Sequence, residues 1–158
     1  LLNIIHGEET PTSGQISFAG QNLSRQEITS ISPYILQDSH YFDTLSLEDN
    51  VLLGLDKNQE TLNHILKKTE LEHLKNRMLS NDSLSGGEKQ RLEIARALYH
   101  DSQLILADEI KANLDLENSR KVSDLLFSLP QTVIEVIHHY TEEDLKHYDQ
   151  VIHLSREK

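Results

Sequence analysis

The sequence predicts an α/β fold, in which short strands alternate with helices. Three mostly apolar runs have the length of buried strands, and each ends in polar side chains. Stretches between them carry apolar residues at helical spacing. In open α/β sheets, ligands bind at the edge where the strands end. The runs are 31–36, followed by Gln37-Asp38; 104–107, followed by Asp108-Glu109; and 132–137, followed by His138-His139.

Composition limits the class of protein. The chain has 158 residues, about the length of one domain, and we expect 1–158 to form a single domain. A formal net charge of −11 argues against a protein that wraps nucleic acid by general electrostatics. The lack of cysteine excludes disulfides and thiolate metal sites, and fits a cytosolic environment. No apolar run approaches the roughly 20 residues of a membrane span.

The first part of the chain predicts a helix end, a turn and strands. Apolar spacing in 1–5 indicates the tail of a helix that ends at Gly7. Residues 8–14 have turn composition. Alternation in 15–20 predicts a half-buried strand, and 21–30 read as a polar connector with a short helical tendency before the strand at 31–36.

Residues 46–79 predict helices. Ser46–Gly54 starts with a capping residue and ends with glycine, which favours a short helix. From Gln59 to Leu79 the apolar residues fit one or two amphipathic helices. Their stripe consists of Leu62, Ile65, Leu66, Leu71, Leu74 and Met78.

The octapeptide Leu84-Ser85-Gly86-Gly87-Glu88-Lys89-Gln90-Arg91 has the most specific local chemistry. Ser85 and Glu88 fit a capping box, so a helix begins here. Gly86 and Gly87 leave its first turn bare, and free N–H groups at the positive end of a helix dipole suit a phosphate. The octapeptide alone leaves both a well-capped helix and a phosphate site open.

The last part predicts two helices and a strand. Residues 116–129 carry a stripe of Val122, Leu125, Leu126 and Leu129, and Pro130 ends that helix. Thr141 is the expected cap of a further helix, and 149–154 is the expected last strand.

Taken in order, these segments resemble the nucleotide-binding domain of ATP-binding cassette (ABC) proteins. The resemblance implies a P-loop NTPase core of the ABC type, with a helical subdomain at about 43–98 and a small antiparallel β-region. Leu84–Arg91 resembles the ABC signature, Leu104–Glu109 the Walker B strand and Ala112–Asp115 the D-loop, while Gln37 and His138 stand where the Q-loop glutamine and switch histidine belong.

The resemblance also implies ATP and Mg²⁺ as cofactors. Phosphoryl transfer needs a divalent ion and a group that orients the attacking water. By resemblance, Asp108 supports Mg²⁺ and Glu109 polarises the water. Gln37 contacts the Mg²⁺ or the water, and His138 hydrogen-bonds the γ-phosphate. The alternatives for the last two are a surface glutamine and one of nine scattered histidines.

Further implied sites lie between two copies of such a domain, which pair head to tail in the family. Ser85, Gly86 and Gly87 would contact the nucleotide held by the second domain. Asp115 would lie at their interface, or would be simply a helix N-cap.

The chain departs from the usual family pattern near both motifs. Glu88 replaces the commoner glutamine of the signature, and its charge would slightly oppose a phosphate. Ile110 and Lys111 stand where proline and threonine are usual, and Asn113 differs in the D-loop. None of these changes removes a group with an implied catalytic role.

The glycine-rich loop G-x-x-x-x-G-K-[ST] does not occur in 1–158. We therefore expect a partial domain that lacks the P-loop strand, which is an ATPase in the complete protein and inactive by itself.

The resemblance implies a transporter, and 42–54 is more similar to ABC exporters than to importers. Its partners would be a transmembrane domain and a second nucleotide-binding domain, at the cytoplasmic face of the membrane, with no nucleic acid. The alternatives are a soluble ABC ATPase of DNA repair or translation, and a non-catalytic fragment. The compact segment from Gln37 to Leu84 and the acidic charge favour the transporter.

Overall fold

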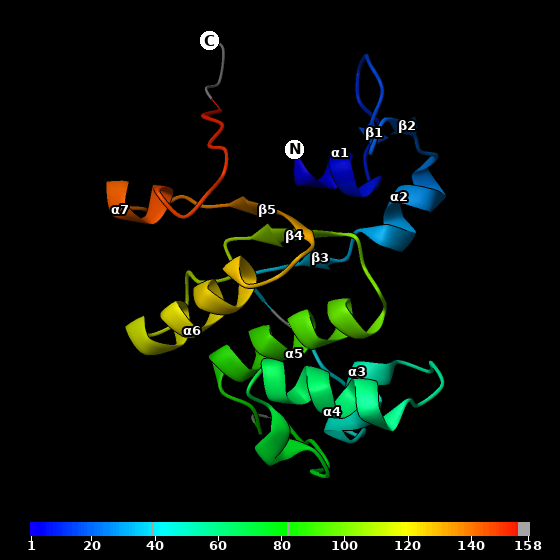
Figure 1. Cartoon of the computed structure of the whole chain (residues 1–158), viewed down its shortest axis with the longest axis vertical. Helices are drawn as coiled ribbons and strands as arrows, with labels where there is room; N and C mark the ends of the chain where they lie inside the picture. The colour runs from blue at the N-terminus through cyan, green and yellow to red at the C-terminus, as the bar shows by residue number, and fades with distance from the viewer. Residues whose placement is uncertain (39, 82, 155–158) are drawn as a thin grey trace.

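The computed structural model describes residues 1–38, 40–81 and 83–154. Helices and short strands alternate along the chain (Figure 1). The elements are α1 (Leu2–His6), β1 (Ser17–Phe18), β2 (Gln21–Asn22), α2 (Arg25–Ile31), β3 (Tyr34–Ile35), α3 (Leu47–Leu52), α4 (Gln59–Lys68), η1 (Glu72–Leu74), α5 (Gly86–Tyr99), β4 (Leu104–Asp108), α6 (Leu116–Phe127), β5 (Thr132–Val136) and α7 (Glu142–Leu145).

The central sheet has the order β3-β4-β5, and both strand pairs are parallel. Ile35 lies beside Ala107, and Asp108 beside Val136. Because all strands run the same way in this register, their carboxyl ends meet at one edge, as the sequence predicts. The first four residues of β4 are buried, as expected for the middle strand.

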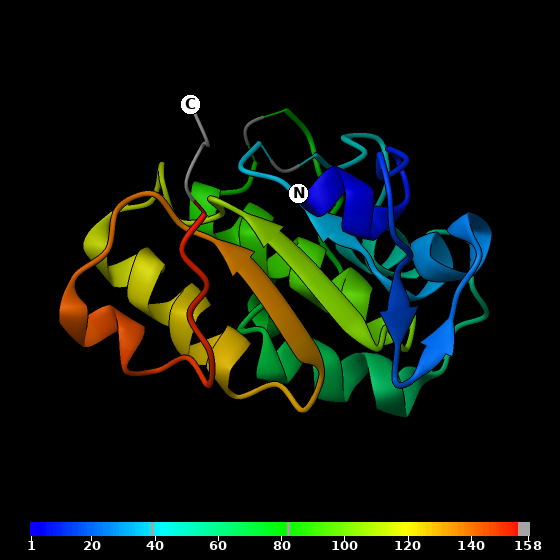
Figure 2. The same cartoon turned by 90° about the horizontal axis from the view of Figure 1, so that it is seen from above.

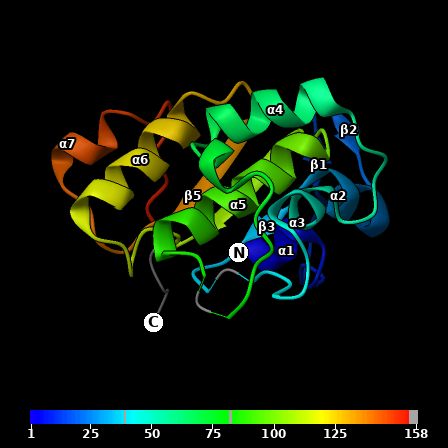
Figure 3. The same cartoon turned by 90° about the horizontal axis from the view of Figure 1, so that it is seen from below.

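Helices cover both faces of the sheet. Ile105 and Ala107 of β4 pack in one cluster with residues of α5 and α6, whereas Leu104 and Leu106 pack with Leu2 of α1 on the other face. Figure 1 accordingly shows α1 above the sheet and α5 and α6 below it, and Figure 3 shows those two helices from below. This alternation of two buried faces explains the continuous apolar run in β4.

The helix α1 ends at the predicted residue. Gly7 adopts φ 87°, and N–H groups of the cap bond to the carbonyls of Asn3 and Ile4. A Cβ on Gly7 would lie 3.0 to 3.1 Å from atoms of Arg25 and Ile28 in α2. Glycine is therefore required both for the left-handed backbone and for the close approach of α2.

The small antiparallel β-region is a hairpin of β1 and β2 (Figure 2), shorter than the predicted strand at 15–20. The segment interpreted as a connector, 21–30, supplies β2 and most of α2. The helix forms because Ser24 and Glu27 make a capping box, a signal that the sequence interpretation did not use.

Between β3 and β4 the chain is mainly helical. The elements α3, α4, η1 and α5 share one core cluster, which contains every residue of the predicted stripe except Met78. Met78 is 63% exposed, because the chain has left the helix at η1 and Met78 instead forms an isolated bridge with Ser46. The boundary 43–98 for a helical subdomain stays a prediction.

The strand predicted at 149–154 is not present. Val151, Ile152 and Leu154 are exposed and belong to no strand or helix. Among the described residues β5 is an edge strand with one open side, but 149–154 do not pair with it, so the apolar residues of this segment were not enough to predict a strand. Within the same residues, no helix combines the length and apolar character needed to cross a bilayer.

Candidate active site at the strand ends

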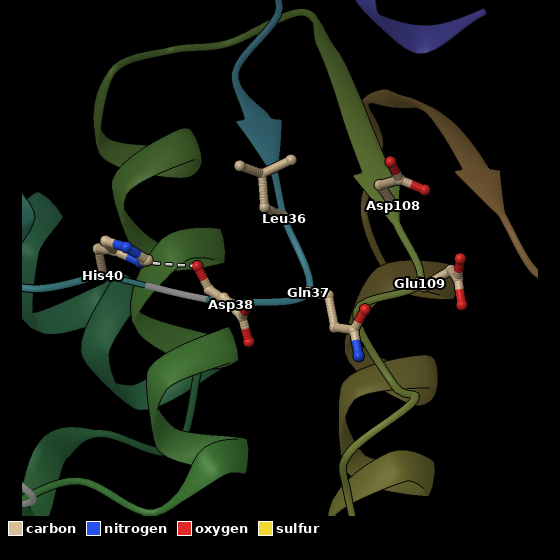
Figure 4. Close-up of a pocket in the computed structure, with 6 residues that line it drawn as sticks. All are labelled: Leu36, Gln37, Asp38, His40, Asp108 and Glu109. Carbon is tan, nitrogen blue, oxygen red and sulfur yellow. Dashed lines mark hydrogen bonds between the residues drawn. The ribbon is translucent and has the colours of Figure 1, made fainter.

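The carboxyl ends of β3 and β4 surround a cavity of about 400 Å³. It brings together three residues that the sequence singles out, Gln37 after β3 and Asp108 and Glu109 at the end of β4 (Figure 4). The other lining residues are Leu36, Asp38 and His40. His40 and Asp38 were not predicted as site residues; their only sequence signal is their nearness to Gln37.

The backbone at Gln37 is hydrogen-bonded to α5, the signature helix, which begins within the octapeptide 84–91. Gln90 is buried in α5, and its side-chain amide donates hydrogen bonds to the carbonyl oxygens of Gln37, at 2.9 Å, and Leu36, at 3.3 Å. The backbone that leaves β3 is therefore held by α5, about 50 residues further along the chain.

Asp108 is oriented by a tyrosine that sequence analysis missed. The hydroxyl of Tyr34, on the adjacent strand β3, donates a 2.9 Å hydrogen bond to Oδ2 of Asp108. Burial, together with this carboxylate, raises the pKa of Tyr34 to about 12. The hydroxyl thus stays protonated at neutral pH and acts as a fixed donor.

Glu109 is held by its backbone and by its side chain. It adopts φ 51°, a left-handed conformation that is uncommon outside glycine, and its N–H donates to the carbonyl of Val136 at 3.0 Å. Its Oε1 lies 3.0 Å from Nε2 of His138, which follows β5. His138 is thus brought to Glu109, although it does not line the cavity of Figure 4.

The predicted capping box at the start of α5 is confirmed. The Ser85 hydroxyl accepts from the Glu88 N–H, and Oε2 of Glu88 accepts from the N–H and the hydroxyl of Ser85, each at 2.8 Å. His73 lies 3.1 Å from the other carboxylate oxygen. Burial alone would raise the pKa of Glu88, but the hydrogen bonds from Ser85 and His73 outweigh it and lower the pKa. The charged carboxylate of Glu88, the residue that replaces the commoner glutamine, is therefore stabilised by these hydrogen bonds.

The two signature glycines have different surroundings. Gly86 is exposed, whereas Gly87 is buried, and a Cβ on Gly87 would lie 2.4 Å from Oδ1 of Asn118 in α6. Glycine at position 87 is thus explained by helix packing, and only Ser85 and Gly86 offer an open surface. None of these three residues lines the cavity at the strand ends.

Asp115 is the N-cap of α6. Its carboxylate accepts from the N–H of Asn118 at 2.9 Å and from its side-chain amide at 2.7 Å. These hydrogen bonds lower the pKa of Asp115. Asn118 also accepts a 3.4 Å hydrogen bond from Arg91 of α5, so the D-loop segment lies against the signature helix.

The donor set at the strand ends suits Mg²⁺. Carboxylate and amide oxygens are ligands that this ion takes, and it usually binds one or two protein carboxylates together with water and phosphate oxygens. Among the described residues there is no group of three or more His, Cys, Asp or Glu side chains that could hold a metal by themselves. Asp108 and Gln37 would therefore hold the ion only together with water or a phosphate ligand.

Comparison with known proteins agrees with this arrangement. Residues 1–112 match the family described as ABC transporter. The lactococcin-A transport/processing ATP-binding protein LcnC of Lactococcus lactis is 33% identical over 87% of this chain, and the molybdenum import ATP-binding protein ModC of a Shewanella strain is 32% identical over all of it. The structure of cbiO1 from Clostridium perfringens, part of the ABC transporter complex cbiONQ, shares the fold with a TM-score of 0.76 at 24% identity over 87% of this chain.

The match over 1–112 places the chain in the ABC transporter family, within the α/β P-loop NTPase fold. Members of this family bind ATP together with Mg²⁺. The chain spans 21% of LcnC, 46% of ModC and 61% of the cbiO1 chain.

Proposed function

We propose that this chain belongs to the ATP-binding and hydrolysing part of an ABC transporter that exports its substrate. The observation that carries the proposal is the cavity where Gln37, Asp108 and Glu109 meet, in a chain that also has the signature helix. Two carboxylates and an amide at the ends of parallel strands form a site for a metal-bound phosphate.

Each residue has a role in this proposal. Bound Mg²⁺ neutralises phosphate charge, and Asp108 and Gln37 are its protein contacts. Glu109 orients the attacking water. His138 lies 3.0 Å from Glu109, close enough to fix the position of that carboxylate, and donates to the γ-phosphate when nucleotide is bound.

The signature has its role in a second domain of the same kind. Ser85 and Gly86 are exposed at the start of α5, separate from the cavity. The free N–H groups and positive dipole of this helix end suit a phosphate held by a partner domain. Gly87 lets α6 pack close to this helix end, and Asp115 faces the partner from the start of α6.

Export from the cytoplasm is the finer part of the proposal. It is supported by the resemblance of 42–54 to exporters and by the similarity to LcnC; the similarity to ModC makes import the alternative. The chain would then lie at the cytoplasmic face of a membrane, attached through a transmembrane partner domain.

The activity is tested in the complete protein with the variant Glu109→Gln. Its amide keeps the shape of the side chain but removes the carboxylate that orients water, so we expect a fall in kcat of at least about 100-fold with ATP binding retained. Phosphate release and nucleotide binding measure the two effects. Wild-type turnover in this variant would show that the catalytic role is misassigned.

The direction of transport is tested in inside-out membrane vesicles that contain the complete transporter. Vesicles are incubated with a cell extract and MgATP, and solutes that accumulate inside are identified by mass spectrometry. Export predicts accumulation that vesicles with Glu109→Gln lack. Loss of preloaded solute on addition of MgATP would indicate import.

A further inference from the structure

A buried ion pair lies beside the loop that follows β4. Nζ of Lys111 is 2.9 Å from Oε1 of Glu135 on β5, and their side chains are 20% and 1% exposed. The hydroxyl of Tyr148 donates to the other carboxylate oxygen of Glu135.

The carboxylate of Glu135 depends on Lys111. Among the described residues, Oε1 accepts no hydrogen bond of good geometry, so the ammonium group of Lys111 is what offsets its charge. A buried charge without a partner is strongly destabilising. Lys111 is therefore held at this position on the sheet, although a lysine side chain is ordinarily free to move in solvent.

Lys111, which Glu135 holds in this way, is two residues from Glu109. Three successive contacts fasten residues 109–111 to β5 and the residues after it: Glu109 N–H to Val136 O, Glu109 Oε1 to His138 Nε2, and Lys111 to Glu135. Glu109 keeps a left-handed backbone at φ 51°, a conformation that persists where its surroundings hold it. Lys111 supplies the contact on the C-terminal side of Glu109.

We propose that Lys111 and Glu135 are a positioning pair, which fixes the loop from Glu109 to Asp115 on β5 so that the Glu109 carboxylate is aimed at the cavity. This inference rests on the proposed role of Glu109 in hydrolysis. The pair touches neither nucleotide nor metal in the proposal, so its loss changes the chemical step and leaves nucleotide affinity intact.

The test uses the complete protein and the variants Lys111→Met and Lys111→Arg. Methionine keeps the length of the side chain but removes the charge, and we expect kcat for ATP hydrolysis to fall roughly tenfold with KM within about twofold of wild type, because a small misplacement of a catalytic group is costly. Arginine keeps the charge and is expected to keep kcat within about twofold of wild type. Lys121→Met is the matched control, since Lys121 pairs with Glu117 only on the surface of α6.

If Lys111→Met folds poorly, Glu135→Gln serves as the second variant, since it keeps the shape and an acceptor for Tyr148 while removing the charge. A loss of kcat in the Met or Gln variant, with arginine active, supports the pair. Wild-type kcat in both variants, or equal loss in the Met and Arg variants, overturns it. The proposed function fails separately, if the wild-type protein does not hydrolyse MgATP or if Glu109→Gln is fully active.

Discussion

Each of the two acidic residues at the end of β4 already has a partner in the protein. Asp108 accepts from Tyr34, and Glu109 meets His138. A hydrogen bond to a carboxylate fixes its rotamer, and such outer contacts tune how a carboxylate serves a metal. The side chains are therefore oriented before any ligand arrives, by a residue of β3 and by a residue that follows β5.

This arrangement predicts that Tyr34→Phe raises the Mg²⁺ concentration for half-maximal ATP hydrolysis by the complete protein. Without the 2.9 Å hydrogen bond, Asp108 loses its fixed orientation, and we expect an increase of about tenfold. The measurement is ATPase activity as the Mg²⁺ concentration is raised at constant total ATP.

The matched control is Tyr99→Phe. The Tyr99 hydroxyl also donates a hydrogen bond, in this case to the backbone carbonyl of Asp56, and accepts one from the Asn58 N–H, but it lies at the opposite end of α5 from the signature. An unchanged Mg²⁺ requirement in Tyr34→Phe, or an equal increase in both variants, would contradict a role for Tyr34 at the metal.

At the scale of elements, the contact between α5 and α6 joins the signature to the D-loop. The side-chain amide of Asn118 donates to Asp115, its oxygen accepts from Arg91, and the side chain fills the space beside Gly87. One asparagine thus sets how closely the two helices approach.

The close approach predicts that Gly87→Ala destabilises the fold by about 1–3 kcal/mol, the usual cost of overpacking. The added methyl group would lie 2.4 Å from Oδ1 of Asn118. Asn118→Ala in the same chain should recover part of the loss by removing the clashing atoms. Urea unfolding of the purified variants measures both effects.

Gly86→Ala is the control for this prediction. Its Cβ would meet only the end of the flexible Leu114 side chain, at 3.0 Å, so a smaller effect is expected. Equal destabilisation by the two alanine variants would show that the asparagine contact is not the cause.

Elements with local signals could be predicted from the sequence. The glycine end of α1 and the capping box of α5 depend on residues within a few positions, and the structure has both. The pairs Tyr34–Asp108 and Lys111–Glu135 could not be predicted, because their partners are 74 and 24 positions apart and meet only through strand order. The expected strand at 149–154 failed for a related reason, since a strand needs a partner that local sequence does not reveal.

For the candidate site, sequence analysis found the residues at the strand ends, whose geometry follows from a parallel sheet. It did not find Tyr34, which orients Asp108, and it did not predict that His138 lies beside Glu109. Whether Gln37, His138, Ser85 and Asp115 have the proposed roles stays a prediction that awaits kinetics of the complete protein.

At the scale of the whole molecule, the negative net charge of the chain opposes the binding of a phosphate group. The chain has a formal net charge of −11, and Asp108 and Glu109 meet at the cavity at the strand ends. A triphosphate is attracted to such a surface only when a cation or a cradle of N–H groups offsets the repulsion. The exposed helix end that could help, at Ser85 and Gly86, does not line this cavity.

We therefore predict that residues 1–158 by themselves bind MgATP weakly, with a Kd above about 1 mM, and show no measurable hydrolysis. The 158 residues contain no G-x-x-x-x-G-K-[ST] loop, which supplies the backbone cradle and the lysine for the β- and γ-phosphates in P-loop proteins. Gln37 and His138 could reach only a γ-phosphate, while the two carboxylates repel it. Titration calorimetry of the purified chain with MgATP is the measurement, with Asp108→Asn as a comparison that removes one negative charge. Micromolar binding would show that these residues contain a phosphate cradle of another kind.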